Sequence, residues 1–427
     1  MSTHRLGNPQ EHLSVSTTPL SWKMLLLIVV AALVVRIVCL LALQSWEFKY
    51  EWAYGHEMGR IGKWLALGKG FMLQDDTPTA KFTPTYPFVV AGFFLLFGVY
   101  SKAAAIGLFL FQSLCAGVSA VCLVILGNRF FGRTAGLMAG CIWAIYPTSI
   151  FYSVVHIWYS EFAVMLLLLT MVVAVLAERP PTLWHIAGLG GLSGLIMLTD
   201  STMNLYLPLL LLWTLVVGRV GLPKLTIAGV VWVVAAGIVV SPWIVRNGLV
   251  MGSPRLMKSN AGEALFYGNN PFSSGTNDRT EMAQAEAALD QQELQYYQSQ
   301  PELIYHQYLR GKALEWIREH PADFVWLTIR RVGYFWGGIP SLGAKTWLRR
   351  AYYVPLIILA LYGLWRSRHH WWDLAPVWLF LLVYPLPYYL MHVARGRYIY
   401  PVEPLVVLLA VAAFQKYQRI GFLKTTQ

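Results

Sequence analysis

The chain has 427 residues, of which 57% are hydrophobic and only 13% are charged, and its mean hydropathy is +0.51. An ordinary soluble domain is about a quarter charged, so this composition excludes a soluble single-core protein and indicates a polytopic membrane protein. In a soluble chain the net charge of +12 would favour a nucleic-acid partner. Here it fits basic cytoplasmic loops beside anionic membrane lipids, and we exclude nucleic acid as a partner.

Apolar blocks recur along the whole sequence and predict about ten transmembrane helices. The first block, 24–44, is long enough to span roughly 30 Å of hydrocarbon. The others lie near 103–127, 134–150, 157–177, 183–199, 202–218, 225–243, 351–365, 374–391 and 400–417. We therefore expect an all-α integral membrane protein.

The charges of the short loops predict the orientation, because Lys and Arg concentrate on the cytoplasmic side. With the N-terminus inside, the short inner segments are basic, whereas the short outer loop 148–160 has no Lys or Arg. This predicts a multi-pass protein with both termini cytoplasmic, and we place it in a bacterial inner (plasma) membrane. Residues 45–85 and 246–350, both then on the outer face, hold 15 of the 21 acidic residues, so we expect function to face outward.

The first outer loop, 45–102, contains an amphipathic pattern. Tyr54, Met58, Ile61 and Leu65 recur at helical spacing, which predicts a helix on the membrane interface. The apolar run 86–97 is about 18 Å long as a helix, too short to span, and is expected to be re-entrant or interfacial.

The second outer segment, 246–350, is predicted to form a small domain between spans 7 and 8. It is polar and turn-rich through 268–271, then helical over 278–298 and 301–319. The predicted parts of the chain are an N-terminal transmembrane module 1–245 that includes the outer loop 45–102, the outer domain 246–350, and a C-terminal transmembrane module 351–427.

Short motifs follow one another in a characteristic order. They are IGKWLALG at 61–68, YP at 86–87 before a run ending LFG at 96–98, PWIVRN at 242–247, YGNNP at 267–271, and RYxxPxxP at 397–404. In order and spacing the chain resembles the GT-C superfamily of polyprenyl-phosphate-sugar glycosyltransferases. The branch it resembles contains the protein-mannosyltransferases and aminoarabinose transferases.

This resemblance implies an inverting glycosyltransferase of the cell envelope. Such an enzyme moves a sugar from a polyprenyl-phosphate donor to a glycan, lipid or protein acceptor at the outer face, and a carboxylate of the first outer loop acts as general base. The family pattern has Asp, often Asp-Glu, where this chain has Tyr54-Gly55. The nearest carboxylates, Glu51 and Glu57, both stay candidates for the base. The alternative for Glu57 is an ion pair with Arg60 on a solvated helix.

Two charged residues lie within or beside apolar blocks. Glu161 resembles a second catalytic or substrate-orienting carboxylate of the family's second outer loop, and its alternative role is to place negative charge at a helix N-terminus. Arg36 lies inside the first span, where an unpaired cation is costly. Its expected partner is an outer carboxylate, with Asp200 the first candidate and Glu57 and Glu161 the others.

Arg395 and Arg397 break the charge rule, because they lie in a short outer loop. An arginine fork can hold the phosphate of a lipid carrier, and the family's Arg-Tyr motif falls on Arg397. The alternative for Arg397 is snorkelling to lipid headgroups. Further candidates for substrate contact are Arg60, Lys81, Tyr86, Lys102, Arg246, Arg330 and Arg331.

The sequence gives no pattern for a structural metal site. The four cysteines lie in apolar blocks, and the ten histidines include no H-E-x-x-H. A divalent cation that bridges phosphate and carboxylates is compatible with the superfamily. Two other functions stay open: a flippase or transporter of a lipid-linked glycan, which would favour inverted repeats and broken helices, and a non-catalytic assembly protein in which Glu57, Glu161 and Arg397 would tolerate alanine.

Overall fold

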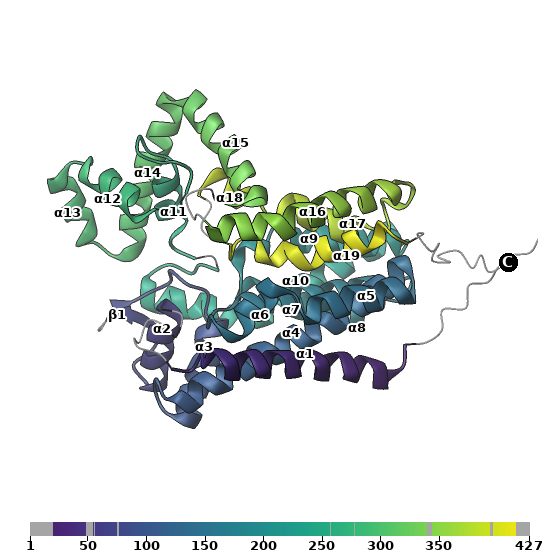
Figure 1. Ribbon diagram of the computed structural model, residues 1–427. Helices are drawn as coiled ribbons and strands as arrows, with labels where there is room; N and C mark the ends of the chain where they lie inside the picture. Colours follow the sequence, from purple (N-terminus) through teal and green to yellow (C-terminus); the bar gives the residue numbers. More distant parts are fainter. Residues whose placement is uncertain are drawn as a thin grey trace, which may run out of the picture.

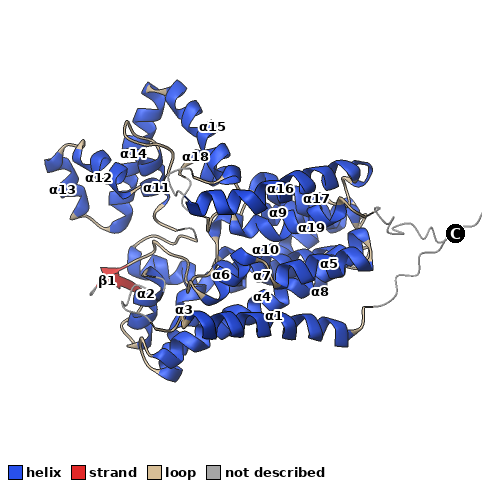
Figure 2. Cartoon of the chain, in the orientation of Figure 1, coloured by secondary structure: helices blue, strands red, loops and turns tan. Residues whose placement is uncertain are grey.

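The computed structural model describes residues 20–47, 54, 56–74, 77–256, 258–276, 278–339, 344–392 and 396–415. Within these residues the fold is helical, and its one sheet is a two-stranded antiparallel ribbon of β1 (Met72–Gln74) and β2 (Thr77–Pro78) (Figure 2). This agrees with the all-α fold expected from the sequence.

Most helices lie side by side in one bundle, and the remaining ones gather at one of its ends (Figure 1). The bundle helices are α1 (Trp22–Leu43), α4 (Lys102–Phe131), α5 (Arg133–Ala144), α6 (Pro147–Val154), α7 (Ser160–Leu176), α8 (Leu183–Met197), α9 (Tyr206–Val217), α10 (Leu222–Met251), α16 (Ala344–Arg366), α17 (Ala375–Val383) and α19 (Glu403–Ala412). Short 3₁₀ turns cover Ser201–Met203, Arg368–His370 and Tyr400–Val402.

Three of the described helices, α1, α4 and α10, are long and apolar enough to cross a membrane, and α5 with α6 forms a fourth such unit bent by 48°. The shorter apolar helices include α7, α8, α9, α17 and α19. The chain is thus an integral membrane protein, and a helix lies at each apolar block of the sequence. The count of ten spans stays a prediction.

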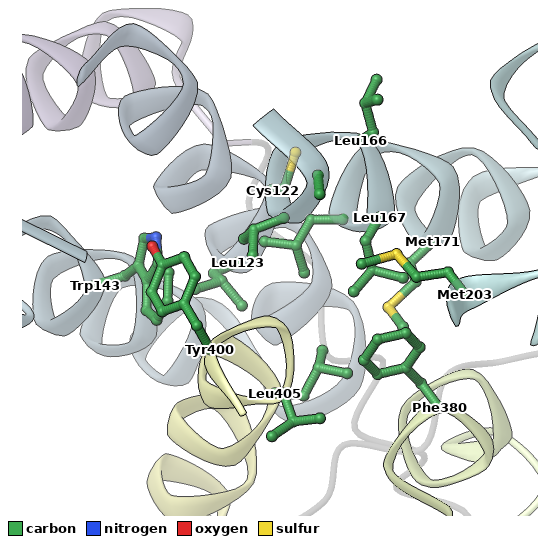
Figure 3. Close-up of a cluster of buried hydrophobic side chains, with 14 of the residues drawn as sticks. Cys122, Leu123, Trp143, Leu166, Leu167, Met171, Met203, Phe380, Tyr400 and Leu405 are labelled. Carbon is green, nitrogen blue, oxygen red and sulfur yellow. The ribbon is translucent and has the colours of Figure 1, made fainter. Parts of the chain in front are cut away.

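Helix α4 is central to the bundle and packs on α1, α5 and α7. It approaches α5 closely, since a Cβ added at Gly136 would lie 2.4 Å from the carbonyl oxygen of Val124. Small residues permit such close contact between membrane helices. The core beside α4 is filled by Leu123, Trp143 and Tyr400 and by residues of α7, α17 and α19 (Figure 3).

The first outer loop folds at one end of the bundle, where α2 (Glu57–Ala66) packs on α3 (Thr85–Phe97). The predicted apolar stripe of α2 is its packed face, because Tyr54, Met58 and Ile61 are all buried. The helix predicted over this stretch is confirmed. Its placement on the membrane interface stays a prediction.

The second outer segment contains α11 (Ala261–Gly268), α12 (Arg279–Ala287), α13 (Gln291–Gln298), α14 (Glu302–Glu319) and α15 (Pro321–Gly337). The single helix expected over 278–298 is wrong: Asp290 starts a new helix by accepting hydrogen bonds from the backbone N–H groups of Gln292 and Glu293, at 2.9 and 2.8 Å. The sequence reading also missed α11 and α15. Helix α18 (Leu386–Leu390) lies beside α15.

The proposed domain boundaries fall inside helices. Residue 245 lies within α10, and residue 350 lies within α16. Both helices therefore continue from the bundle into the outer segment.

Candidate functional site

Gln112 of α4 fixes the loop that joins α6 to α7. Its side-chain Nε2 donates to the carbonyl oxygens of Tyr152 at 2.9 Å and of Ser153 and His156 at 3.2 Å. Its Oε1 accepts from the backbone N–H of Trp158 at 3.1 Å. A buried amide that satisfies four backbone groups holds this loop in one conformation.

The loop presents two neighbouring aromatic rings, and each ring lies under a cation. The rings of Trp158 and Tyr159 are 5.4 Å apart between centroids. The Arg397 guanidinium lies 4.9 Å from the Trp158 ring, and the Lys258 ammonium lies 5.4 Å from the Tyr159 ring. Aromatic faces favour cations at these distances. The structure thus brings together one predicted residue, Arg397, and one that the sequence reading missed, Lys258.

Charge and burial distinguish these two cations from the histidine beside them. Burial lowers the pKa of Lys258 below its usual value, the positive charge of Arg397 acts in the same direction, and Asp200 opposes both. Burial and Arg397 also lower the pKa of His156 to about 4. His156 is therefore neutral at physiological pH, and the positive charge at the loop belongs to Arg397 and Lys258.

The buried carboxylate of Asp200 is connected to Arg397 through a chain of hydrogen bonds and ring contacts. Asp200, which follows α8, accepts from the backbone N–H and the hydroxyl of Thr202 at 3.1 and 2.7 Å. The Thr202 hydroxyl accepts from Tyr388 at 3.2 Å, and the Tyr388 ring stacks on Tyr398 at 4.4 Å. Tyr398 in turn lies 5.3 Å from the Arg397 guanidinium. The sequence reading proposed Asp200 only as a partner for Arg36.

Glu57 is the first residue of α2, in the first outer loop. Its side chain is 31% exposed and lies 3.6 Å from His56 Nδ1. It is one of the groups whose charge favours the cationic form of Arg397. Arg60, the predicted ion-pair partner, is exposed. The other two candidates for this region, Glu51 and Arg395, lie outside the described residues.

Glu161 lies in the interior of the bundle, next to Ser153, whose carbonyl oxygen also accepts from Gln112. Its side chain is fully buried, and Oε1 accepts hydrogen bonds from the hydroxyls of Ser149 at 2.9 Å, Ser153 at 3.1 Å and Tyr400. It lies in the first turn of α7, as the alternative role at a helix N-terminus predicts, but it is buried there. A role of Glu161 in direct substrate contact stays a prediction.

Arg36 shares the same two serines. Its Nε donates to Ser153 at 3.0 Å and its Nη2 donates to Ser149 at 2.7 Å. The buried arginine of α1 is thus bridged to Glu161, the third candidate partner, rather than to Asp200. Sequence reasoning preferred Asp200 because it lies at a span end, whereas the bend between α5 and α6 brings the serines to Arg36.

Three further predicted residues have structural partners. Lys81 forms an ion pair with Glu263 of the outer domain at 2.8 Å. The two terminal nitrogens of Arg246 donate to the carbonyl oxygens of Thr79 and Phe71 at 2.8 and 2.9 Å. These contacts join the first outer loop to α11 and α10. Tyr86 is buried, and its hydroxyl donates a hydrogen bond to Gln112. It therefore helps to position the residue that holds the aromatic loop, which is the segment between α6 and α7 that carries Trp158 and Tyr159.

The remaining three predicted cations also have partners. Lys102 pairs with Glu47 at 2.5 Å, and Arg330 donates to the Tyr334 hydroxyl at 2.9 Å. Arg331 is fully buried and donates to the backbone carbonyl oxygens of Tyr389 and Leu390 at 3.2 and 3.3 Å. None of the three contacts Trp158 or Tyr159 in the described part of the chain.

An apolar groove of about 790 Å³ opens between α2, β1, α3, α8 and α10. Phe71, Phe88, Leu198 and Trp243 are among its lining residues, and Lys69 and Arg246 are its cationic ones. The groove includes the end of α8, two residues before Asp200. The first outer loop is held against this end of α8 by two hydrogen bonds. Thr83 donates to the carbonyl oxygen of Thr199, and Thr85 donates to that of Leu198.

Among the described residues, no three His, Cys, Asp or Glu side chains converge as a metal site.

Comparisons with known proteins give distant structural matches. No family model and no curated protein matches the sequence. The fold is similar to ArnT from Cupriavidus metallidurans bound to undecaprenyl phosphate, with 17% identity, a TM-score of 0.40, and coverage of 93% of this chain and 78% of ArnT. For ArnT in the apo state the identity is 16%, the TM-score is 0.36, and the coverage is 89% and 76%.

Proposed function

We propose that this chain is an inverting glycosyltransferase that takes its sugar from a polyprenyl-phosphate donor. The observation that carries this is the pair of cations on adjacent rings, Arg397 over Trp158 and Lys258 over Tyr159, beside the partly exposed carboxylate of Glu57. A phosphate needs such cations, and an acceptor hydroxyl needs such a base.

The donor lipid fits two neighbouring parts of the molecule. Its phosphate would bind between Arg397 and Lys258, where both cations are partly removed from water and interact more strongly with an anion. Its apolar chain would lie in the groove that ends at Leu198, whose walls are mostly hydrophobic. The sugar is bonded to the phosphate on the side away from the apolar chain, and it would then lie near Asp200 and Glu57.

The proposed reaction is a single displacement at the anomeric carbon. Glu57 takes the proton of the acceptor hydroxyl as its oxygen forms a bond to that carbon, on the side opposite the phosphate. The bond from the anomeric carbon to the phosphate oxygen breaks, and polyprenyl phosphate leaves with the electron pair. Arg397 and Lys258 stabilise the charge that develops on that oxygen. Glu51 stays the alternative base.

The outer face is the proposed location of this reaction. The acidic outer segments and the basic inner loops favour this orientation, with both termini cytoplasmic in a bacterial inner membrane. The acceptor would be a glycan, lipid or protein presented at that face. The outer-domain contacts of Lys81 with Glu263 would then close the site from the aqueous side.

The test is a donor panel on purified protein. The full chain in detergent is incubated with polyprenyl phosphates that carry different sugars, and release of polyprenyl phosphate is followed by mass spectrometry. We expect release from at least one donor, and release about 10² to 10⁴ times slower by Glu57→Gln at equal folded concentration. Movement of intact donor across a liposome bilayer without release would identify a flippase. No release and no movement for any donor would favour an assembly protein.

A further inference from the structure

A second pocket lies in the outer domain, away from the aromatic loop. It has a volume of about 320 Å³ and is formed where α14 meets α15 and the loop after α11. Its lining residues are Asn270, Pro271, Ser273, Trp316, His320, Asp323, Trp326, Leu327 and Arg330. Two tryptophans thus share one concave surface with a carboxylate, an arginine and a hydroxyl.

The wall made by the loop after α11 is rigid. Asn270 donates to the carbonyl oxygens of Phe266 and Tyr267 at 2.9 and 3.1 Å, and its Oδ1 accepts from the N–H of Phe272 at 2.9 Å. A Cβ at Gly268 would lie 1.7 Å from the carbonyl oxygen of Met391, so this loop also lies tightly against the segment after α18. A preformed wall lowers the entropic cost of binding.

The opposite wall presents an aromatic surface. Trp316, near the end of α14, stacks on His320 with ring centroids 5.3 Å apart and an angle of 15°. His320 Nδ1 is hydrogen-bonded to the Trp316 carbonyl oxygen at 3.2 Å, which fixes both rings. Trp326 of α15 is 59% exposed. Flat apolar surfaces of this kind match the C–H faces of a sugar ring.

Several polar atoms at the pocket remain free for a ligand. Among the described residues, none hydrogen-bonds the Asp323 carboxylate. Arg330 uses Nη2 for the Tyr334 hydroxyl at 2.9 Å and keeps its other nitrogens. The Ser273 oxygen accepts from Gly275 N–H at 3.1 Å and can still donate its own proton. A carboxylate with an arginine and a hydroxyl suits adjacent hydroxyl groups, which both donate and accept.

The pocket and the apolar surface of α15 lie on different sides of that helix. Val325, Ile329 and Val332 are exposed and share one face, which in a membrane protein is suited to lipid. Asp323 and Arg330 share a second face, roughly 140° away on a helix of 3.6 residues per turn. When the apolar face contacts lipid, the pocket faces the aqueous phase.

We propose that this pocket binds a pyranose unit of a saccharide. The tryptophans would stack on the ring, Asp323 would accept from two neighbouring hydroxyls, and Arg330 and Ser273 would contact the others. An anionic phosphate group fits less well, because Asp323 would repel it. The inference does not require the proposed transfer reaction, although an acceptor glycan held here would lie in the same outer domain that covers the site.

The test measures binding without donor and without turnover, so it is independent of the transferase proposal. Purified full-length protein in detergent is probed by saturation-transfer NMR with the methyl glycosides of glucose, galactose, mannose and N-acetylglucosamine. We expect transfer to the ring protons of at least one glycoside. Asp323→Asn and Trp316→Ala should each weaken that binding by about tenfold or more.

The matched control is Trp184→Ala, which removes a tryptophan that is 87% exposed on α8, outside the pocket; it should bind like the wild type. Asp323→Asn changes one exposed side chain and preserves its shape, so it remains informative if Trp316→Ala fails to fold. Absence of transfer to every glycoside would overturn the inference. Equal transfer in the wild type and Asp323→Asn would overturn it too.

Discussion

The two glutamates that the sequence offers as catalytic, Glu57 and Glu161, lie in opposite environments. Glu161 is fully buried, accepts from three hydroxyls and is bridged to Arg36 through two serines. Glu57 is partly exposed, at the start of a helix in the first outer loop, near one histidine and Arg397. In Glu161, Oε1 accepts from three hydroxyls and Oε2 is buried without a hydrogen-bond partner, whereas the Glu57 carboxylate is partly exposed to solvent.

This difference separates a structural role from a chemical one. A carboxylate held by hydroxyls and a buried cation cannot approach an acceptor without breaking that network, which is expensive inside a protein. A carboxylate at the surface of a site has an oxygen atom that remains available to accept a proton from an acceptor hydroxyl. We therefore assign stability to the Glu161 network and propose proton acceptance for Glu57.

The largest expected effect is on turnover. Glu57→Gln keeps the size and polarity of the side chain but cannot accept the proton, so turnover should fall by about 10² to 10⁴. Donor binding should change little. Steady-state release of polyprenyl phosphate measures this, with Glu51→Gln as the comparison variant. Loss in Glu51→Gln with normal Glu57→Gln would move the base to Glu51.

The next effect is on stability. Arg36→Met removes the buried cation and leaves Glu161 without its counter-charge, so we expect a loss of about 3–5 kcal/mol and a lower thermal unfolding midpoint in detergent. The control is Trp184→Ala, an exposed change on α8. An unchanged midpoint for Arg36→Met would contradict the structural role of this network.

Arg397 should affect donor affinity and kcat/KM. Arg397→Ala should cost on the order of tenfold to a hundredfold, because a charge-assisted hydrogen bond contributes about 1.5–3 kcal/mol. Arg397→Lys should also have a lower donor affinity than the wild type, since an ammonium cannot present the planar fork to two oxygens. The comparison uses folded protein with an unchanged elution profile. Full activity in both variants would indicate a residue that only snorkels to lipid headgroups.

The smallest effect is the pH dependence given by Lys258. Because burial lowers its pKa, wild-type Lys258 loses its charge at a lower pH than an ordinary lysine, and donor affinity should fall as pH rises through that lowered value. Lys258→Arg keeps its charge and should bind more tightly than the wild type at alkaline pH. At neutral pH the two should differ by less than about fivefold. Parallel pH profiles would exclude Lys258 from the phosphate site.

Composition and periodicity were sufficient for the helical fold. A helix lies at each predicted apolar block, and the stripe of Met58 and Ile61 predicted the packed face of α2. The helices of the outer domain were harder to predict. Short polar helices such as α13 depend on one capping residue, Asp290, within a uniformly polar stretch.

The candidate site was only partly predictable, for physical reasons. Arg397 stood out because a cation is unusual in a short outer loop. Lys258 and Gln112 have no comparable signal in the sequence, because their roles depend on a fold that brings them to Trp158 and Tyr159. The sequence position of Glu161 correctly predicted a helix start, but it does not reveal that Arg36 and two serines of α6 bury and bridge this carboxylate.

The most direct measurement compares the two glutamates in one experiment. Glu57→Gln, Glu161→Gln and wild type are each mixed with the active donor in excess of its Kd, below all three unfolding midpoints, and the first turnover is followed by mass spectrometry per folded molecule. We predict that Glu161→Gln transfers at close to the wild-type rate despite a lower midpoint, whereas Glu57→Gln binds the donor but transfers about 10² to 10⁴ times more slowly. Wild-type transfer by Glu57→Gln together with inactive, folded Glu161→Gln would contradict the account and place the chemistry in the bundle.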